Sequence, residues 1–346
     1  MKRAVLAIVV VLALGGLSVA LVARTNGSSP APGPGRLTAR QRAEQRTAKT
    51  WSTGAQAALQ PLVEKTPELI GAIDGWLAGT QDAATFASTA DQSVAAFTSA
   101  EAAVERLPPF PSVPLVNDTY RRSTALYREW GRVAQTLVSV PPGDLRTQVG
   151  TIARRVRELA DRVFDQGQDE VNARLHNPTS PDVIVKRPLE VPNWAAEGLE
   201  AGPPLAPPTT TASGPLPVRE GARPTQARSA WAKAVGAAAL PGPRELAGAL
   251  TSGDAGALGA LAARWEAVAA ALDAVPDPVG GRGDADRVRL AVLLQAEAAR
   301  AAQAATFLSG AARAGLTDVA RAVGATSDGL WPRGLADHRS GLPAGG

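Results

Sequence analysis

The sequence predicts an all-α protein in which an N-terminal transmembrane or signal helix precedes two tandem, duplicated four-helix-type bundles joined by a proline-rich linker. Hydrophobic residues make up 45% of the chain, and many of them are alanines, whereas aromatic residues make up only 4%. Such a composition suits close-packed helices better than sheets. Apolar residues also recur at i, i+3 and i+4 spacing, and a set of residues recurs at a constant offset of 168.

Residues 1–24 have the pattern of a signal peptide or a transmembrane anchor. Lys2 and Arg3 precede an uncharged, mainly apolar run at 4–23, which as a helix would span roughly 30 Å, the thickness of one hydrocarbon core. Ser18 and Ala20 are small residues suited to a signal cleavage site. We favour the anchor because the apolar run continues past that site. Residues 25–36, rich in glycine and proline, are predicted to form a flexible stalk.

The body of the protein is predicted to lie outside the cytoplasm. Basic residues flank the apolar run on both sides, so the positive-inside rule does not decide the orientation. The short N-terminal tail and the cysteine-free, Thr/Pro-rich body favour export. We therefore expect a single-pass protein of the cell membrane with an extracytoplasmic C-terminal body. The alternative is a protein secreted after signal cleavage.

Residues 37–176 are predicted to form the first helical bundle. Its first helix, over 37–60, carries an apolar stripe, and short turns between amphipathic helices are typical of an up-down bundle. Proline is expected to kink or end a helix, and Thr or Asp to cap the start of one. The residues expected to begin or end helices in this bundle are Pro61, Thr66, Pro67, Asp82, Asp118 and Asp144.

The second bundle is predicted over 225–331, after a linker at 177–224 that contains eleven prolines and no helical period. Its helices are expected at about 245–251, 255–275, 284–309 and 317–330. The interior is mostly alanine, which buries little area per residue, so this bundle is predicted to be the less stable one. The tail at 332–346 is rich in glycine and proline and is predicted to be disordered.

The two predicted bundles resemble each other in sequence. At the offset of 168, Phe97 corresponds to Trp265, and Asp118, a predicted helix cap, corresponds to Asp286. Other pairs at this offset are Leu107 with Val275, Pro108 with Pro276, Arg121 with Arg289, Leu126 with Leu294 and Gln135 with Gln303. At an offset of 180, Trp51 corresponds to Trp231 and Pro61 to Pro241. Matches of tryptophan and proline are harder to obtain by chance than matches of alanine, so we interpret the repeat as a duplication.

The charge pattern argues against a nucleic-acid partner. The net charge is +4, but residues 36–176 hold 17 basic and 16 acidic side chains, and residues 225–335 hold 11 and 10. Phosphate backbones are bound by surfaces of a single sign, and neither bundle has the surplus for one.

No cofactor, metal or enzymatic activity is predicted. The two histidines, His176 and His338, lie at a bundle edge and in the predicted tail, and no helix carries the Glu-x-x-His pairs of a di-metal bundle. The absence of cysteine excludes disulfides and thiolate ligands. No nucleophile elbow, phosphate loop or dinucleotide fingerprint occurs. An enzyme would need an unpaired, pKa-shifted carboxylate inside a bundle.

One face of the fourth helix is the candidate site for an anionic partner. Arg121, Arg128 and Arg132 share this face, with Tyr120 and Tyr127 beside them. Arginine pairs bidentately with phosphate or carboxylate, and tyrosine can add stacking. The alternative interpretation is a bundle helix with its aromatic residues in the core and its arginines in water.

These observations predict a non-enzymatic, membrane-anchored or secreted binding or scaffolding protein of the bacterial envelope. Its expected partners are the membrane, through residues 4–23, and an envelope protein or anionic polymer. The alternative function is a carrier or sensor that holds a small apolar ligand between helices. Its cavity would be lined by Trp51, Trp76, Phe97 and Trp130.

Overall fold

The computed structural model describes residues 39–110, 115–175, 243–273 and 282–339, and all regular structure within these ranges is helical. The predicted membrane segment 4–23, the stalk and the linker at 177–224 lie outside the described residues. Contacts divide the chain into one unit at 1–44 and one at 45–346. The helices are α2 (Ala39–Leu77), α3 (Ala83–Glu105), α4 (Leu115–Val138), α5 (Asp144–Leu175), α7 (Pro243–Ser252), α8 (Ala255–Asp273), α9 (Arg282–Thr306) and α10 (Gly310–Arg339).

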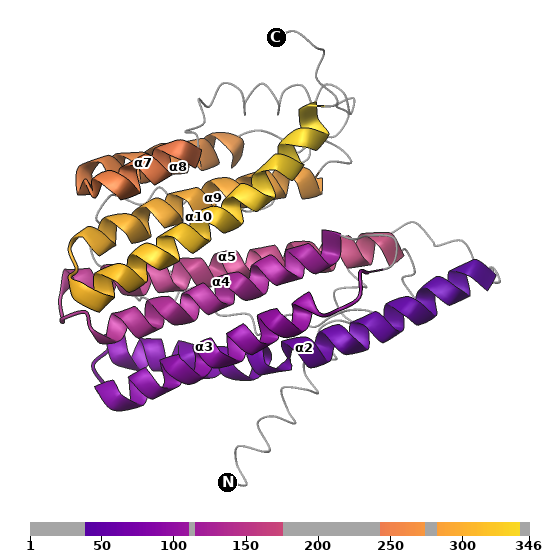
Figure 1. The fold of residues 1–346 in the computed structure, drawn as a ribbon, viewed down its shortest axis with the longest axis horizontal. Coiled ribbons are helices and arrows are strands. Elements are labelled where there is room, and N and C mark those ends of the chain that lie inside the picture. The colour runs from indigo at the N-terminus through magenta and orange to yellow at the C-terminus, as the bar shows by residue number, and fades with distance from the viewer. Residues whose placement is uncertain (1–38, 111–114, 176–242, 274–281, 340–346) are drawn as a thin grey trace. The chain divides into compact units, whose positions relative to one another are not determined.

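The helices of the larger unit lie in layers (Figure 1). The order is α7 with α8, then α9 with α10, then α5 with α4, and finally α3 with α2. We call α2–α5 the first half and α7–α10 the second half. Helices α4, α5, α9 and α10 form a closed ring, because α4 packs on α5, α5 on α9, α9 on α10 and α10 on α4. The central four-helix arrangement therefore takes two helices from each half, and one apolar core cluster runs through both.

The helices of the two halves match at the offset found in the sequence. Moving α4 by 168 residues gives 283–306, and α9 spans Arg282–Thr306. The same shift takes α3 to 251–273, which overlaps α8, and α5 to 312–343, which overlaps α10. We call the contacts between the halves, α5–α9 and α4–α10, the two seams. Because the shift matches α4 with α9 and α5 with α10, it also matches one seam with the other.

Helix α2 is longer than predicted because it continues through two prolines. Pro61 was expected to kink or end it, yet α2 runs from Ala39 to Leu77 with Pro61 and Pro67 inside. Pro67 is exposed, and the carbonyl freed by Pro61 belongs to the exposed Ala57, so water can satisfy it. The apolar stripe continues on both sides of the prolines. Its buried members are Trp51, Ala55, Ala58, Leu59, Leu62, Leu69, Ala72, Ile73 and Trp76.

Several other helix ends differ from the predictions, among them the start of α10, which was expected at about 317 and lies at Gly310. Asp118 was expected to cap the fourth helix, but α4 begins at Leu115 and places Asp118 in its first turn. There the carboxylate pairs with Arg121 and Arg122, and a negative charge is favourable near a helix N-terminus. Helix α10 extends to Arg339, into the tail at 332–346 that was predicted to be disordered. By contrast, Asp82 caps α3 as expected, since its carboxylate accepts a hydrogen bond from the Thr85 backbone N–H at 2.9 Å.

Four tight turns lie at the same end of the helices (Figure 1). They join α2 to α3, α4 to α5, α7 to α8 and α9 to α10. Each contains a glycine with positive φ, a conformation that other residues adopt at a cost. These glycines are Gly79, Gly143, Gly253 and Gly310.

The α4–α10 seam is close because glycines of α10 face side chains of α4. A Cβ added to Gly315 would lie 2.9 Å from Thr136 Oγ1, and one added to Gly329 would overlap the Arg122 guanidinium. Both glycines are therefore places where a side chain of α4 occupies the space of a missing Cβ. The two contacts also show that α4 and α10 run antiparallel, because the higher residue number on one helix faces the lower number on the other.

Candidate functional site

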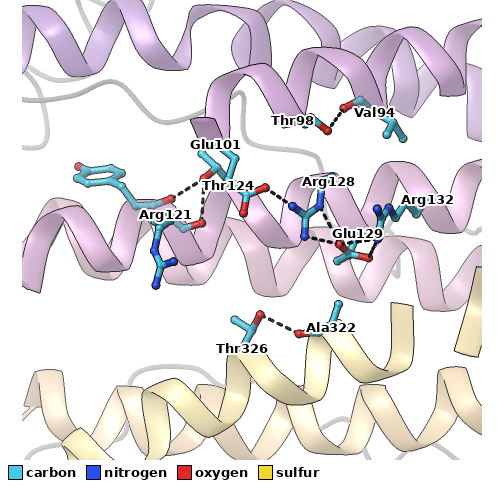
Figure 2. Close-up of polar contacts among 11 residues, drawn as sticks. Val94, Thr98, Glu101, Arg121, Thr124, Arg128, Glu129, Arg132, Ala322 and Thr326 are labelled. Carbon is cyan, nitrogen blue, oxygen red and sulfur yellow. Dashed lines mark hydrogen bonds and ion pairs between the residues drawn. The ribbon is translucent and has the colours of Figure 1, made fainter. Parts of the chain in front are cut away.

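The three arginines of the predicted anionic-partner face form a strip along α4. Arg121, Arg128 and Arg132 follow one another at spacings of seven and four residues, which places them on one side of the helix. In Figure 2 this side of α4 has Glu101 of α3 on one flank and Ala322 of α10 on the other. Arg121 and Arg132 leave 47% and 44% of their side chains exposed, whereas Arg128 is more covered. We call these three residues the arginine strip.

Each member of the arginine strip has a carboxylate partner. Arg121 lies 3.1 Å from Asp118, and Arg132 lies 3.4 Å from Glu129. Arg128 pairs with Glu129 at 2.8 Å and makes a short contact with Glu101, which joins α3 to α4 (Figure 2). Partial burial raises the pKa of Glu101, and the Arg128 charge acts against this rise. Glu129 is itself fully buried, so its contacts with two arginines are part of the packing of α4.

The two tyrosines predicted beside the strip point into the core instead. Tyr120 and Tyr127 each precede a strip arginine by one residue, which rotates them about 100° around the helix. Both are buried, and Tyr120 packs edge-on against Phe164 with ring centroids 4.9 Å apart. The Tyr127 hydroxyl makes a short hydrogen bond to Asp161, and burial and that carboxylate raise the pKa of Tyr127 well above its usual value. The arginines are thus available at the surface without the aromatic stacking that we expected.

The four aromatic residues of the predicted apolar-ligand cavity are buried, and Phe97 and Trp130 stack on each other, whereas Trp51 and Trp76 each pack against a different ring. Trp51 belongs to a smaller cluster at one end of the first half, where its ring lies 4.8 Å from Phe110. The other three lie in the main core: Trp76 stacks on Phe86 at 5.2 Å, and Phe97 stacks on Trp130 at 5.7 Å. The rings contact other rings, and the indole N–H groups of Trp51 and Trp76 donate to backbone carbonyls.

A second polar site, absent from the predictions, lies inside the protein where α5 meets α8 and α9. The Arg300 guanidinium holds Glu266 Oε1 at 2.7 Å through Nε and at 2.5 Å through Nη2. Arg155 of the first half reaches both carboxylates, with Nη1 at 3.8 Å from Glu266 and 3.6 Å from Glu297. Glu266, Glu297 and Arg300 are buried, and Arg155 is mostly so. We call these four residues the buried charge cluster.

Glu297 has the most perturbed environment in this cluster. Its burial raises the pKa from the usual 4.5 to about 7, although the charges of Arg155 and Arg300 act in the opposite direction. Its Oε1 accepts no hydrogen bond from the described residues. Glu297 is therefore a pKa-shifted carboxylate inside a bundle, as an enzymatic function would require. It is not unpaired, however, since the Arg155 guanidinium stands beside its other oxygen.

The sequence matches at the offset of 168 contain a signal that could have found this cluster. At the offset of 168, Glu129 corresponds to Glu297 and Arg132 to Arg300, and both glutamates are buried. A glutamate and an arginine three residues apart are also typical of a solvated helix pair, so the spacing alone does not indicate burial. The partner that crosses between the halves, Arg155, has no charged counterpart, because its equivalent on α10 is Val323.

Comparison with protein-family models, with curated proteins and with solved structures gives no match to this chain.

Helix α8 is the one described helix that is long and apolar enough to cross a membrane by length and composition. The apolar window is Ala255–Leu272, an internal segment, and half of it is buried inside the protein. A buried core helix has the same properties. An open groove of about 420 Å³ lies between α7 and α8, with the Arg264–Glu245 pair at 2.7 Å among its lining residues. Within the described ranges, no three His, Asp or Glu side chains gather as metal ligands would.

Proposed function

We propose that the protein is a non-enzymatic binding or scaffolding protein of the bacterial envelope, anchored by residues 4–23 with its helical body outside the cytoplasm. The observation that carries the proposal is the arginine strip. It presents two half-exposed guanidinium groups, Arg121 and Arg132, on a helix that also contacts α3, α5 and α10. A ligand bound there would thus be held by the central part of the body.

The strip fits a partner that carries carboxylate or phosphate groups. Counting Arg122, four arginines face the three carboxylates of Asp118, Glu101 and Glu129, which leaves a surplus of one positive charge. Exposed ion pairs such as Arg121–Asp118 contribute little to stability, about 0–1 kcal/mol. An anionic partner can therefore replace the internal carboxylate at small cost. The expected partner is an anionic envelope polymer or the acidic surface of an envelope protein.

The interior supports a scaffolding role. Charged side chains that could serve chemistry, such as Glu266 and Arg300, contact each other across α8 and α9 and hold these two helices together. The matching helix bounds and the repeated Glu–Arg pair also support the origin of the two halves by duplication. The carrier function is not favoured, because its four aromatic residues fall into two separate clusters and pack against other rings.

Binding to a polyanion tests the proposal. We would measure binding of poly-L-glutamate to the full-length protein in nanodiscs at low salt, for the wild type and for Arg121→Ala/Arg132→Ala. Two charge-assisted contacts at about 1.5 kcal/mol each predict an affinity loss of at least tenfold. The matched control is Arg162→Ala/Arg264→Ala, which removes two surface-paired arginines elsewhere and should bind as the wild type does. Equal affinity of the strip variant and the wild type would overturn the assignment.

A second experiment tests the location. Intact cells that carry the full-length protein with a C-terminal tag are treated with protease, and membrane and soluble fractions are blotted for size. Loss of the tag from a membrane-bound species of full size is the expected result. A protected tag would reverse the orientation, and a shorter soluble species would indicate secretion after cleavage.

A further inference from the structure

The buried charge cluster joins the two halves of the molecule. Arg155 comes from α5 of the first half, whereas Glu266 and Glu297 come from α8 and α9 of the second. The ring of α4, α5, α9 and α10 has two seams between the halves, and this cluster lies at the α5–α9 seam. Separating α5 from α9 would therefore pull Arg155 away from both carboxylates.

The other seam is held in a different way. At the α4–α10 seam, Gly315 and Gly329 admit Thr136 and Arg122 into the space of missing Cβ atoms. Val323 of α10 occupies the position that corresponds to Arg155, and Glu129 is paired within its own helix and with α3 through Arg128. One seam thus depends on close packing, and the other includes charges that cross it. Any separation of the two halves that keeps α4 and α10 in contact must occur at the α5–α9 seam.

We propose that the buried charge cluster is a pH-dependent lock at the α5–α9 seam, which holds the two halves together more tightly at acid pH than at alkaline pH. The titrating group is Glu297. The charged groups that face it are Arg155 from α5, Glu266 from α8 and Arg300 on its own helix. Other acidic groups of the elements packed on α9 have different partners. On α5, Glu158 pairs with Arg162 and Asp161 with Arg157; on α10, Asp318 pairs with Arg321 and Asp328 bonds to Gln295; on α7, Glu245 pairs with Arg264.

The direction of the pH effect follows from the protonation of Glu297 in the closed and the open seam. In the closed seam, burial raises the pKa of Glu297 to about 7, so the closed form binds a proton in a range where a water-exposed glutamate has lost it. Opening the seam exposes the carboxylate and returns its pKa towards 4.5. Raising the pH from 5 to 8 therefore increases the equilibrium constant for opening, by roughly 70-fold for a pKa that moves between these two values.

A single cysteine can measure this opening, because the chain has none of its own. Ala301 is fully buried and lies one turn after Glu297 on the same side of α9. In full-length protein carrying Ala301→Cys, we would measure the rate of alkylation at pH 5 and pH 8. Each rate is divided by the rate for the same variant in denaturant, which removes the pH dependence of the thiol itself. We expect the corrected rate to rise roughly 70-fold in the native protein and to change little when Glu297→Gln is added.

A cysteine that faces α10 from the same helix separates seam opening from unfolding. Ala298 is also fully buried, but it faces α10, since its Cβ lies 3.8 Å from a Cβ built on Gly324. The lock predicts that Ala298→Cys responds to pH much less than Ala301→Cys. An equal rise at both cysteines, or a rise at Ala301→Cys that survives Glu297→Gln, would overturn the proposal. A corrected rate that does not change between the two pH values would overturn it as well.

Discussion

Replacing Glu297 by glutamine is expected to stabilise the protein at alkaline pH. Glutamine keeps the shape of the side chain but cannot ionise, so it removes the cost of holding a buried carboxylate charge. The folded-state pKa is raised from 4.5 to about 7, a difference of 2.5 units, and each unit corresponds to about 1.4 kcal/mol. At pH 8 the variant should therefore be more stable than the wild type by about 3 kcal/mol.

The difference in stability between this variant and the wild type depends on pH in a defined way. A carboxyl whose pKa is higher in the folded state binds a proton more readily there, so its contribution to stability is greatest below the unfolded pKa of 4.5. That contribution falls as the pH rises to about 7 and then stays constant. The difference between variant and wild type should accordingly be small near pH 4.5 and reach its full value at pH 8.

Urea denaturation followed by circular dichroism at 222 nm, at several pH values, measures this difference in the full-length protein. The control is Glu158→Gln on α5, where the carboxylate is exposed and pairs with Arg162 at the surface. A competing effect is the loss of a buried ion pair, which can destabilise by about 3–5 kcal/mol. If the variant proves less stable than the wild type at pH 8, the Arg155 contact outweighs desolvation, and our reasoning about Glu297 is refuted.

Three further substitutions test the packing, each by urea denaturation. Gly131→Ala should destabilise the protein by about 1–3 kcal/mol, because the added Cβ would lie 2.8 Å from Val94 Cγ2. In the control Gly71→Ala, the added Cβ meets nothing within 4 Å, so this variant should be more stable than the wild type by about 0.5–1 kcal/mol. Trp130→Ala should cost about 3–5 kcal/mol, since its buried ring stacks on Phe97, and a smaller loss would mean that the core collapses around the gap. Tyr127→Phe should cost about 1–2 kcal/mol and no more, because Asp161 keeps Arg157 as a partner at 2.5 Å.

Helices were predictable where a wide apolar stripe contrasts with charged neighbours. The apolar residues of α3, which include Phe97 and Val104, recur at helical spacing, and the start predicted at Asp82 is confirmed by its cap. Prolines were a poor guide within α2, since the penalty for Pro61 is local whereas the buried stripe continues for several turns beyond it. The helix through Pro332 was missed for a related reason, because a proline near a glycine-rich end is typical of a disordered tail.

The sites were harder to predict than the helices. Sequence spacing placed the arginine strip on one side of α4, but the rotation of about 100° between adjacent residues turned Tyr120 and Tyr127 into the core. The buried charge cluster escaped prediction because α9 is covered on nearly all sides. On an alanine-rich helix, polar residues such as Glu297 and Arg300 are typical of a solvated face, and only the packing of α5 against α9 places them inside.

The closed ring has a consequence for the ancestry of the chain. Each half contributes two neighbouring helices to the ring, and their inner faces are covered by the equivalent pair of the other half. A half made as a separate chain would leave that apolar face in water, and a second copy related by a twofold axis would cover it. If the two halves descend from one gene segment, the ancestor is therefore expected to have been a symmetric homodimer. Joining the two copies in one chain freed them to differ, so that one seam could acquire Arg155 while the other kept an apolar residue at the matching position.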